Sequence, residues 1–401
     1  MDSKKKWIAA TVAIVLVTNV CTYFGSGVIN SLLSRNTGTL TASQYGQAQK
    51  WQKLFYVKEQ LDEYYDGEID EDAMLEGAIK GMTESLGDPY TVYFNEEEYA
   101  DFNTQTEGNY SGVGLQVKAD GDNIVVVGIF DESPAKNAGI LPNDVIEKVD
   151  DTSVSGSELE KAVSLMKGAE GTTVRLTLYR ESKGEFEVTL TRAQISIKTI
   201  SGEMIDSEVG LIEVTMFDNN TAQNFRNMLE ELKGKGMKSL IIDLRGNPGG
   251  LLNECVSMAS NFIEENQVVV STVDKYENTK KYRSEGGAAI GMPLVILTDE
   301  GSASASEIFA GAIRDYKLGT LVGATTFGKG VVQTILEAGD GTALKVTVSK
   351  YYTPNGENIN KTGIKPDVEV EYPESLLTEE YDRSKDPQFT KALEIAKSKI
   401  Q

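Results

Sequence analysis

The sequence predicts an α/β core with an inserted β-rich module, a helical N-terminal region and an N-terminal transmembrane helix. Two apolar runs, residues 240–244 and 294–297, are each followed by a glycine-containing loop and a helical pattern, which is typical of buried strands in an α/β sheet. Residues 109–193 instead read as short strands separated by turns. A long apolar stretch directly behind three lysines predicts the membrane-spanning helix.

The apolar stretch at the N-terminus runs from residue 7 to 24 and extends to Ile29. At ~1.5 Å per residue, a helix of roughly 18 to 23 residues spans about 27–35 Å, enough to cross a bilayer core. The lysines at positions 4–6 are expected to stay in the cytoplasm, so we expect a single-pass protein of the cell membrane with an extracytoplasmic body. Secretion after cleavage of a signal peptide is the alternative, with Gly25-Ser26-Gly27 as a weak cleavage site.

Composition excludes several classes of chemistry. The 401 residues contain no histidine, which rules out Ser-His-Asp triads, Cys-His dyads and His-ligated zinc. The 61 acidic residues against 39 basic ones give a net charge of −22, which argues against nucleic acid as a partner. Cys21 lies in the apolar stretch, so Cys255 is alone in the outer part and cannot form an intrachain disulfide.

The patterns divide the chain into six segments. They are a basic end and anchor at 1–29, a linker at 30–46, a helical region at 47–108, the β-rich module at 109–193, the α/β core at 194–372 and a helical segment at 373–401. In the last segment, Asp386 is placed to cap a helix that begins at Pro387. The apolar side of that helix consists of Phe389, Leu393, Ile395 and Ala396.

The β-rich module resembles a PDZ domain. The resemblance is carried by SGVGL at 111–115, by the SPA and AGI triplets within 133–140, and by DVI at 144–146. Glycines at the entry of a strand let backbone N–H groups face a carboxylate, while an extended peptide adds to the strand edge. The candidate peptide-binding residues are Gly112, Val113, Gly114 and Leu115. The alternative is that the two glycines only shape a hairpin.

Three serines, Ser302, Ser304 and Ser306, cluster where the second buried strand turns into a helix. A serine at a helix N-terminus is commonly an N-cap. A nucleophile at this place would instead benefit from the helix amides and the positive end of the dipole, which stabilise a developing oxyanion. The residues by themselves do not separate the three serines.

Lys329 is the candidate general base in a chain without histidine. An ordinary lysine, with a pKa of ~10.4, is neutral in only about one molecule in 2,500 at pH 7. Lowering that pKa to ~7 requires about 4.6 kcal/mol, and burial among Phe327, Val331 and Val332 is the expected source. The alternative is a solvated loop lysine. The glycine pattern of a P-loop is absent before this lysine.

Together, these motifs strongly resemble the carboxyl-terminal processing peptidases, also called tail-specific serine proteases. The motifs are DLRGNPGG at 243–250, GSASASE at 301–307 and FGKGVVQ at 327–333, supported by LGDPYT at 86–91, YYTPNG at 351–356 and GIKPD at 363–367. The resemblance covers about residues 45 to 400, in one order. It implies a core of crotonase- or Clp-protease-like β/α units with a PDZ insertion.

The resemblance also implies roles for individual residues. Ser304 would be the nucleophile, Lys329 the general base, and Gln333 the residue that orients the lysine. The backbone N–H groups of Gly250 and Ala305 would form the oxyanion hole. Ser302 and Ser306 remain weaker nucleophile candidates, and no metal or cofactor is needed.

The PDZ-like module would capture the free C-terminus of a substrate protein. Lys167 occupies a place where related enzymes carry a basic residue that couples peptide binding to the active site; an ordinary surface lysine is the alternative. The N-terminal helices and the last segment would build a homodimer.

The expected function is therefore a membrane-anchored, extracytoplasmic serine endopeptidase that recognises protein C-termini and cleaves substrates in processing, degradation or regulated signalling. An inactive PDZ scaffold or pseudoprotease that only binds tails is the first alternative. A crotonase-type acyl-CoA enzyme is the second, and the exported, acidic chain with its PDZ-like insert argues against it.

Overall fold

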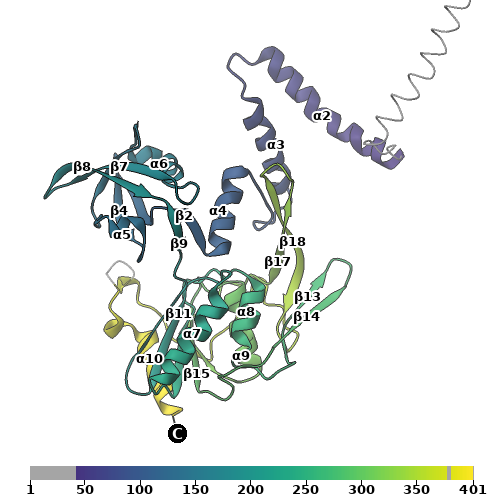
Figure 1. The fold of residues 1–401 in the computed structure, drawn as a ribbon. Coiled ribbons are helices and arrows are strands. Elements are labelled where there is room, and N and C mark those ends of the chain that lie inside the picture. Colours follow the sequence, from purple (N-terminus) through teal and green to yellow (C-terminus); the bar gives the residue numbers. More distant parts are fainter. Residues whose placement is uncertain (1–41, 377–380, 401) are drawn as a thin grey trace, which may run out of the picture. The chain divides into compact units, whose positions relative to one another are not determined.

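The structure, a computed structural model, describes residues 42–376 and 381–400 (Figure 1). The expected membrane anchor at 1–29 lies outside the described residues. Among the helices that are described, none combines the length and the apolar character needed to cross a membrane. The chain divides into two compact units, Met1–Ala78 and Ile79–Gln401.

The first unit is helical where it is described. Helix α2 (Ala42–Tyr64) begins inside the stretch expected to be a linker, and α3 (Glu71–Glu84) starts in this unit and continues into the second. Helix α2 exposes many large apolar side chains: Trp51, Leu54, Phe55, Tyr56, Val57, Leu61 and Tyr64. An apolar surface of this kind is typical of an interaction site rather than of a solvated helix.

After α3, a short strand and a helix precede the β-rich module. Strand β1 (Val92–Phe94) is followed by α4 (Glu96–Glu107). Asn95 caps α4 in a reciprocal box with Glu98, and Gly108 ends the helix in the left-handed conformation, with φ of 69°. This segment carries the chain from the helical region into the module.

The module at 109–193 is a small antiparallel sheet with two short helices, as the sequence predicted. Strand β2 (Asn109–Gly112) pairs with β9 (Ala193–Ser196) at the two ends of the insertion. The sheet order is β3 (Leu115–Asp120), β4 (Asn123–Ile129), β5 (Val145–Val149), β7 (Thr173–Arg180) and β8 (Gly184–Thr191), with β6 (Thr152–Ser153) beside β5. Helices α5 (Pro134–Asn137) and α6 (Leu159–Met166) help to enclose its own apolar core.

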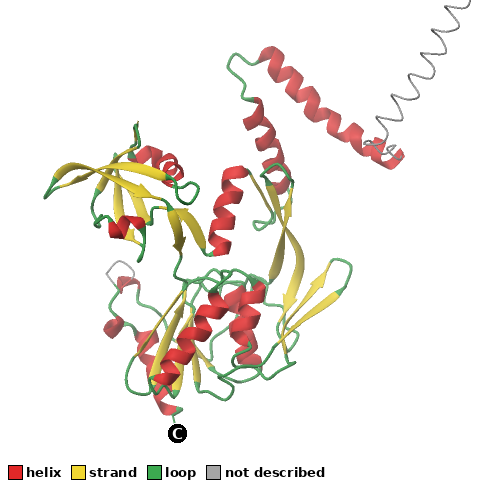
Figure 2. Cartoon of the chain, viewed as in Figure 1, coloured by secondary structure: helices red, strands yellow, loops and turns green. Residues whose placement is uncertain are grey.

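The second sheet is the mainly parallel core (Figure 2). Its order is β10 (Ile200–Met204), β11 (Val209–Val214), β12 (Ser239–Asp243), β15 (Leu294–Thr298), β16 (Thr320–Gly323) and β19 (Val368–Glu369). Strand β10 is antiparallel to β11, and the other neighbours run parallel. Because helices cover both faces, the two predicted buried strands have apolar interiors, residues 240–242 in β12 and 294–297 in β15.

The two faces of this sheet are covered by different helices. Helices α7 (Thr221–Gly234), α8 (Leu252–Ala259) and α9 (Ala305–Asp315) form the larger apolar core with one face. Helix α10 (Pro387–Ser398) covers the other face and is capped by Asp386, as predicted. Its apolar side was expected to serve a dimer; it is instead buried within its own chain, because Phe389, Ala392 and Ala396 pack on the sheet.

A third sheet contains β17 (Val331–Glu337), the strand that follows Lys329. Its order is β1, β18 (Ala343–Tyr352), β13 (Val268–Asp274) and β14 (Thr279–Arg283), with β17 also paired to β18. Val92 of β1 lies opposite Lys345 of β18. The segment before the module is thereby held against strands from the end of the core.

Candidate active site

The site forms where two neighbouring parallel strands end. Strands β12 and β15 pair up to Asp243 and Leu297, so the loops that follow them meet at the same edge of the sheet. The Leu244 amide donates to the Leu297 carbonyl at 3.0 Å, and the Ala303 amide donates to the Asn247 carbonyl at 3.0 Å. These bonds hold the glycine-rich loop against the serine turn.

The structure distinguishes the three serines. The hydroxyl groups of Ser302 and Ser306 are buried and donate to the carbonyls of Leu244, at 2.8 Å, and Asn247, at 3.0 Å. Ser304 is partly exposed and has φ of 55° and ψ of −110°, an uncommon conformation for a residue with a side chain. Strain of this kind is typical of functional turns, and of the three serines only Ser304 is not buried.

The glycine-rich loop lies directly against Ser304. Gly249 has φ of 102°, and a Cβ atom there would lie 2.8 Å from Ser304 Cβ. Gly250 has φ of 137°, and a Cβ atom there would lie 2.2 Å from the Phe217 carbonyl oxygen. In the described part of the chain, the backbone N–H groups of Gly250 and Ala305 donate no hydrogen bond. Both amides are therefore free to donate to an oxyanion.

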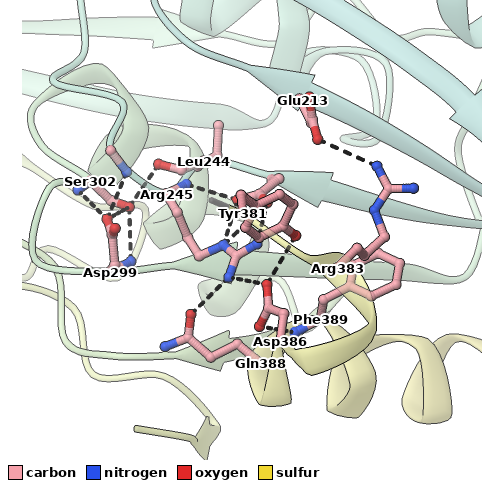
Figure 3. Close-up of polar contacts among 12 residues, drawn as sticks. Glu213, Leu244, Arg245, Asp299, Ser302, Tyr381, Arg383, Asp386, Gln388 and Phe389 are labelled. Carbon is pink, nitrogen blue, oxygen red and sulfur yellow. Dashed lines mark hydrogen bonds and ion pairs between the residues drawn. The ribbon is translucent and has the colours of Figure 1, made fainter. Parts of the chain in front are cut away.

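Buried ionic contacts fix the back of this loop (Figure 3). The Arg245 guanidinium forms a fork with the Asp243 carboxylate and reaches the buried Asp386 carboxylate at 2.8 Å. Gln388 accepts a further bond from the same group at 3.0 Å. Beside it, the Asp299 carboxylate accepts from the Gly246 amide at 2.8 Å. The cap of α10 thus also anchors the loop after β12.

Lys329 lies just before β17 and is largely enclosed. Its Nζ lies 4.6 Å from the centroid of the Tyr90 ring. The pKa of Lys329 is lowered to about 8, mainly by burial and also by the charge of Lys345, while the Asp88 and Glu307 carboxylates oppose the shift. This is the direction that a lysine base requires.

The groups that enclose Lys329 differ from those expected. Phe327 is 57% exposed, and Val331 and Val332 are only half-buried. Tyr90 provides the contact instead, because antiparallel pairing of β1 with β18 brings the LGDPYT segment to the lysine. That motif was part of the family resemblance, but nothing in the sequence assigned it a role at the base.

The three predicted catalytic side chains do not form a hydrogen-bonded row in this structure. Among the described residues, no hydrogen bond joins Lys329 Nζ to Ser304 Oγ or to Gln333. The Gln333 side chain donates to Thr347 Oγ1 at 3.2 Å. Hydrogen bonds between catalytic groups are often long or absent until substrate is bound. The missing bonds therefore do not exclude these residues as catalytic groups.

Glu307 ties the serine turn to the lysine loop. Its buried carboxylate accepts from the Ser304 amide at 2.9 Å and from the Lys329 amide at 2.8 Å. It also accepts from the Gly328 amide at 2.7 Å and from the Thr326 hydroxyl at 2.6 Å. The sequence analysis gave Glu307 no role, although its place three residues after a helix-capping serine is a recognisable signal.

The candidate peptide-binding residues lie where the chain enters the edge of the module's sheet. Gly112, Val113 and Gly114 are buried, and Leu115 begins β3. Gly114 has φ of 80°, and a Cβ atom there would lie 2.2 Å from Ser133 Cβ. Among the described strands, β3 pairs with β4 alone and so ends its sheet. An end strand of this kind can accept an added strand.

Lys167 and Cys255 lie apart from the chemistry. Lys167 follows α6 and forms an ion pair with Asp101 of α4, and among the described residues it has no bond to the serine or lysine loops.

Cys255 is buried, its thiol donates to the Ala305 carbonyl at 3.0 Å, and burial raises the pKa of the thiol. Within the described residues, no group of three or more His, Cys, Asp or Glu side chains is arranged to hold a metal ion.

Comparison with known proteins gives the same picture. Residues 208–370 match the model of peptidase family S41, residues 111–190 match a PDZ domain, and residues 15–98 match the activating protease CtpB N-terminal domain. The chain is 38% identical over 325 residues to the carboxy-terminal processing protease CtpA of Bacillus subtilis (strain 168), covering 81% of this chain and 70% of the relative. It is 36% identical over 374 residues to a probable CtpA-like serine protease of Staphylococcus aureus (strain COL), covering 92% and 73%.

Among solved structures, a putative S41 protease from Bacteroides fragilis NCTC 9343 has the same fold. Its TM-score is 0.52 at 16% identity, over 84% of this chain and 93% of that one. Fold, site and sequence together define a serine-type peptidase with a PDZ domain. The chain belongs to peptidase family S41, among the carboxy-terminal processing proteases.

Proposed function

We propose that the chain is an active endopeptidase that cleaves by covalent acyl transfer, with Ser304 as nucleophile and Lys329 as general base. The observation that carries the proposal is the Glu307 carboxylate, which accepts hydrogen bonds from the backbone of both residues. One buried group therefore sets the spacing of the two segments. The partly exposed, strained Ser304 beside two free amides supports the same assignment.

The lowered pKa makes the base chemically competent. With a pKa of about 8, roughly one Lys329 in eleven is neutral at pH 7, against about one in 2,500 for an ordinary lysine. The neutral amine takes the proton from Ser304 Oγ as this oxygen attacks the peptide carbonyl, and later gives the proton to the leaving amine. The Gly250 and Ala305 amides hold the oxyanion. Water then hydrolyses the acyl-enzyme, with Lys329 again as base.

Forming the productive arrangement requires Lys329 to move. Its Nζ has to approach Ser304 Oγ to about 2.6–3.2 Å, a normal hydrogen-bond distance. Gln333 donates to Thr347 through Nε2, so its Oε1 is the atom that can accept from Lys329 and orient the base. We propose that Lys167 takes part in coupling peptide capture to this change, through its ion pair with Asp101.

The PDZ domain binds C-terminal peptides in this proposal. A tail adds to the free edge of β3, and its carboxylate is held at Gly112, Val113, Gly114 and Leu115.

We further propose that the protein is held in the cell membrane by its N-terminal segment with the catalytic part outside, since three lysines precede the apolar stretch. The exposed apolar side chains of α2 support a homodimer built from the N-terminal helices.

The test is turnover of a peptide with a free apolar C-terminus. Ser304→Ala should abolish cleavage while leaving peptide binding intact. Ser306→Ala is the matched control, since it removes a hydroxyl two residues away that is already bound to the Asn247 carbonyl; it should keep measurable turnover. Cleavage by Ser304→Ala at the wild-type rate would overturn the assignment. Tight binding by the wild type without hydrolysis at any pH would favour the inactive scaffold.

A further inference from the structure

A second half-buried lysine, Lys345, lies close to the base and is not used by the mechanism above. It is on β18, opposite Val92 of β1 and Ile335 of β17. Its Nζ lies 5.2 Å from the centroid of the Phe102 ring and 5.8 Å from that of Phe94. Among the described residues, no carboxylate forms an ion pair with it, and no hydrogen bond engages its Nζ. A cation without a counter-ion needs another explanation.

The aromatic pair provides the seat for this cation. The rings of Phe94 and Phe102 are stacked, with centroids 5.3 Å apart, and come from β1 and α4. The face of an aromatic ring attracts an ammonium ion, and this attraction favours the charged form of Lys345. Burial acts in the opposite direction and lowers the pKa of Lys345. The two rings oppose that shift without pairing the charge, whereas a carboxylate would pair it.

The side chain of Lys345 lies on the face of β18 that also contacts Gln333 and the turn carrying Tyr90. Lys345 and Thr347 are two residues apart in β18, so their side chains point to the same face. On that face Thr347 accepts from the Gln333 side chain at 3.2 Å. The Thr347 amide donates to Thr91 Oγ1 at 3.1 Å, in the turn that also carries Tyr90, the ring over which Lys329 lies.

We propose that Lys345 is a positioning residue for the general base: its uncompensated ammonium disfavours a second positive charge at Lys329 and so increases the fraction of that amine that is deprotonated near neutral pH. This inference rests on the proposed role of Lys329. A cation beside a lysine is a known way to activate an amine. The contacts with the Phe94 and Phe102 rings explain how Lys345 can be half-buried without a carboxylate partner.

The other titratable groups around Lys329 either raise its pKa or are themselves neutral. The carboxylates of Asp88 and Glu307 raise its pKa, while burial and the charge of Lys345 lower it. Tyr90 contributes its ring, and burial raises the pKa of its hydroxyl, which therefore stays neutral through the range in which the base acts. Of the side chains that influence Lys329, Lys345 is the one whose charge favours the neutral amine.

The experiment is a pH–rate profile of kcat/KM on the full-length protein in detergent, with a soluble peptide substrate. Lys345→Met should move the acid limb up by about one pH unit, so kcat/KM on that limb falls about tenfold while the high-pH plateau is kept. Lys345→Arg should restore the wild-type limb, because it keeps the charge and the ring contacts. Lys350→Met, on the exposed part of the same strand, should leave the limb in place.

An equal loss at every pH, or a limb that does not move, would overturn the inference. Lys345→Gln provides a second neutral variant if the methionine variant does not fold. Independently of turnover, the pKa of Lys329 can be measured in the Ser304→Ala protein from its rate of acetylation across pH, read by mass spectrometry. A rise of about one unit with Lys345→Met supports the inference, and no rise refutes it. Retained turnover by Lys329→Met would refute Lys329 as the general base. The effect of Lys345 on the pKa of Lys329, measured by acetylation, would not depend on that outcome.

Discussion

Replacing Glu307 by glutamine tests how the active site is held together. The carboxylate accepts four hydrogen bonds, two at each oxygen: Thr326 Oγ1 and the Gly328 amide at one, and the amides of Ser304 and Lys329 at the other. In either orientation, the amide nitrogen of a glutamine faces two donors. The better orientation places it beside Thr326, whose hydroxyl can turn and accept, so one backbone bond, at Gly328, is lost.

The magnitude follows from these contacts. A hydrogen bond to a charged acceptor contributes ~1.5–3 kcal/mol, and a buried donor left without a partner costs ~1–3 kcal/mol. We expect Glu307→Gln to lower the free energy of unfolding by about 2–4 kcal/mol. Because the lysine loop loses the bond that holds the Gly328 amide, kcat should fall about tenfold. Removing the negative charge also lowers the pKa of Lys329, so the acid limb of kcat/KM should move to lower pH.

Urea unfolding and peptide turnover measure the two effects. The matched control is Asp206→Asn, since Asp206 also accepts two backbone bonds, from Glu208 and Val209, but lies away from the serine turn. This control should lose stability by about 1–2 kcal/mol and keep the wild-type kcat. A Glu307→Gln protein whose unfolding free energy lies within ~0.5 kcal/mol of the wild type would refute the reasoning, because the bond lost at Gly328 and the charge of the acceptor would then contribute nothing.

Two further predictions concern buried charges. The pKa of Lys329 falls from 10.5 to about 8 on folding, so between those values the unfolded chain binds more protons and the wild type gains stability as pH rises. Lys329→Met should therefore be more stable than wild type by about 2 kcal/mol at pH 7, after allowance for its partial exposure, with the difference vanishing towards pH 10.5; equal differences in urea unfolding at pH 7 and 10 would contradict this. Arg245→Met leaves the carboxylates of Asp243 and Asp386 without their cation and should lower the unfolding free energy by ~3–5 kcal/mol, and a loss below ~1 kcal/mol would show that the buried pair is not needed.

The buried strands and the capped helix were readable from the sequence because their signals are local. A parallel strand covered on both faces has a continuous apolar run, as in residues 240–242 of β12 and 294–297 of β15. The cap of α10 needs only Asp386 followed by Pro387. The same apolar side, however, suits a dimer or a sheet in its own chain, and only the fold placed it on the sheet.

The partners of the site residues could not be predicted, because they lie far away in the chain. The carbonyls that occupy the hydroxyls of Ser302 and Ser306 belong to a loop more than 50 positions earlier, so the sequence left three serines open. Tyr90 reaches Lys329 only through the pairing of β1 with β18. No local pattern predicts such a contact.

The sequence by itself determined the chemistry available to this protein. Without histidine, a serine hydrolase of this length has to use another base, and a glycine-flanked lysine is the residue on offer. Only the tertiary structure decided how far the pKa of that lysine is lowered and which side chains surround it. Its pKa depends on burial and on charges brought together from several strands and loops, and these exist only once the chain has folded.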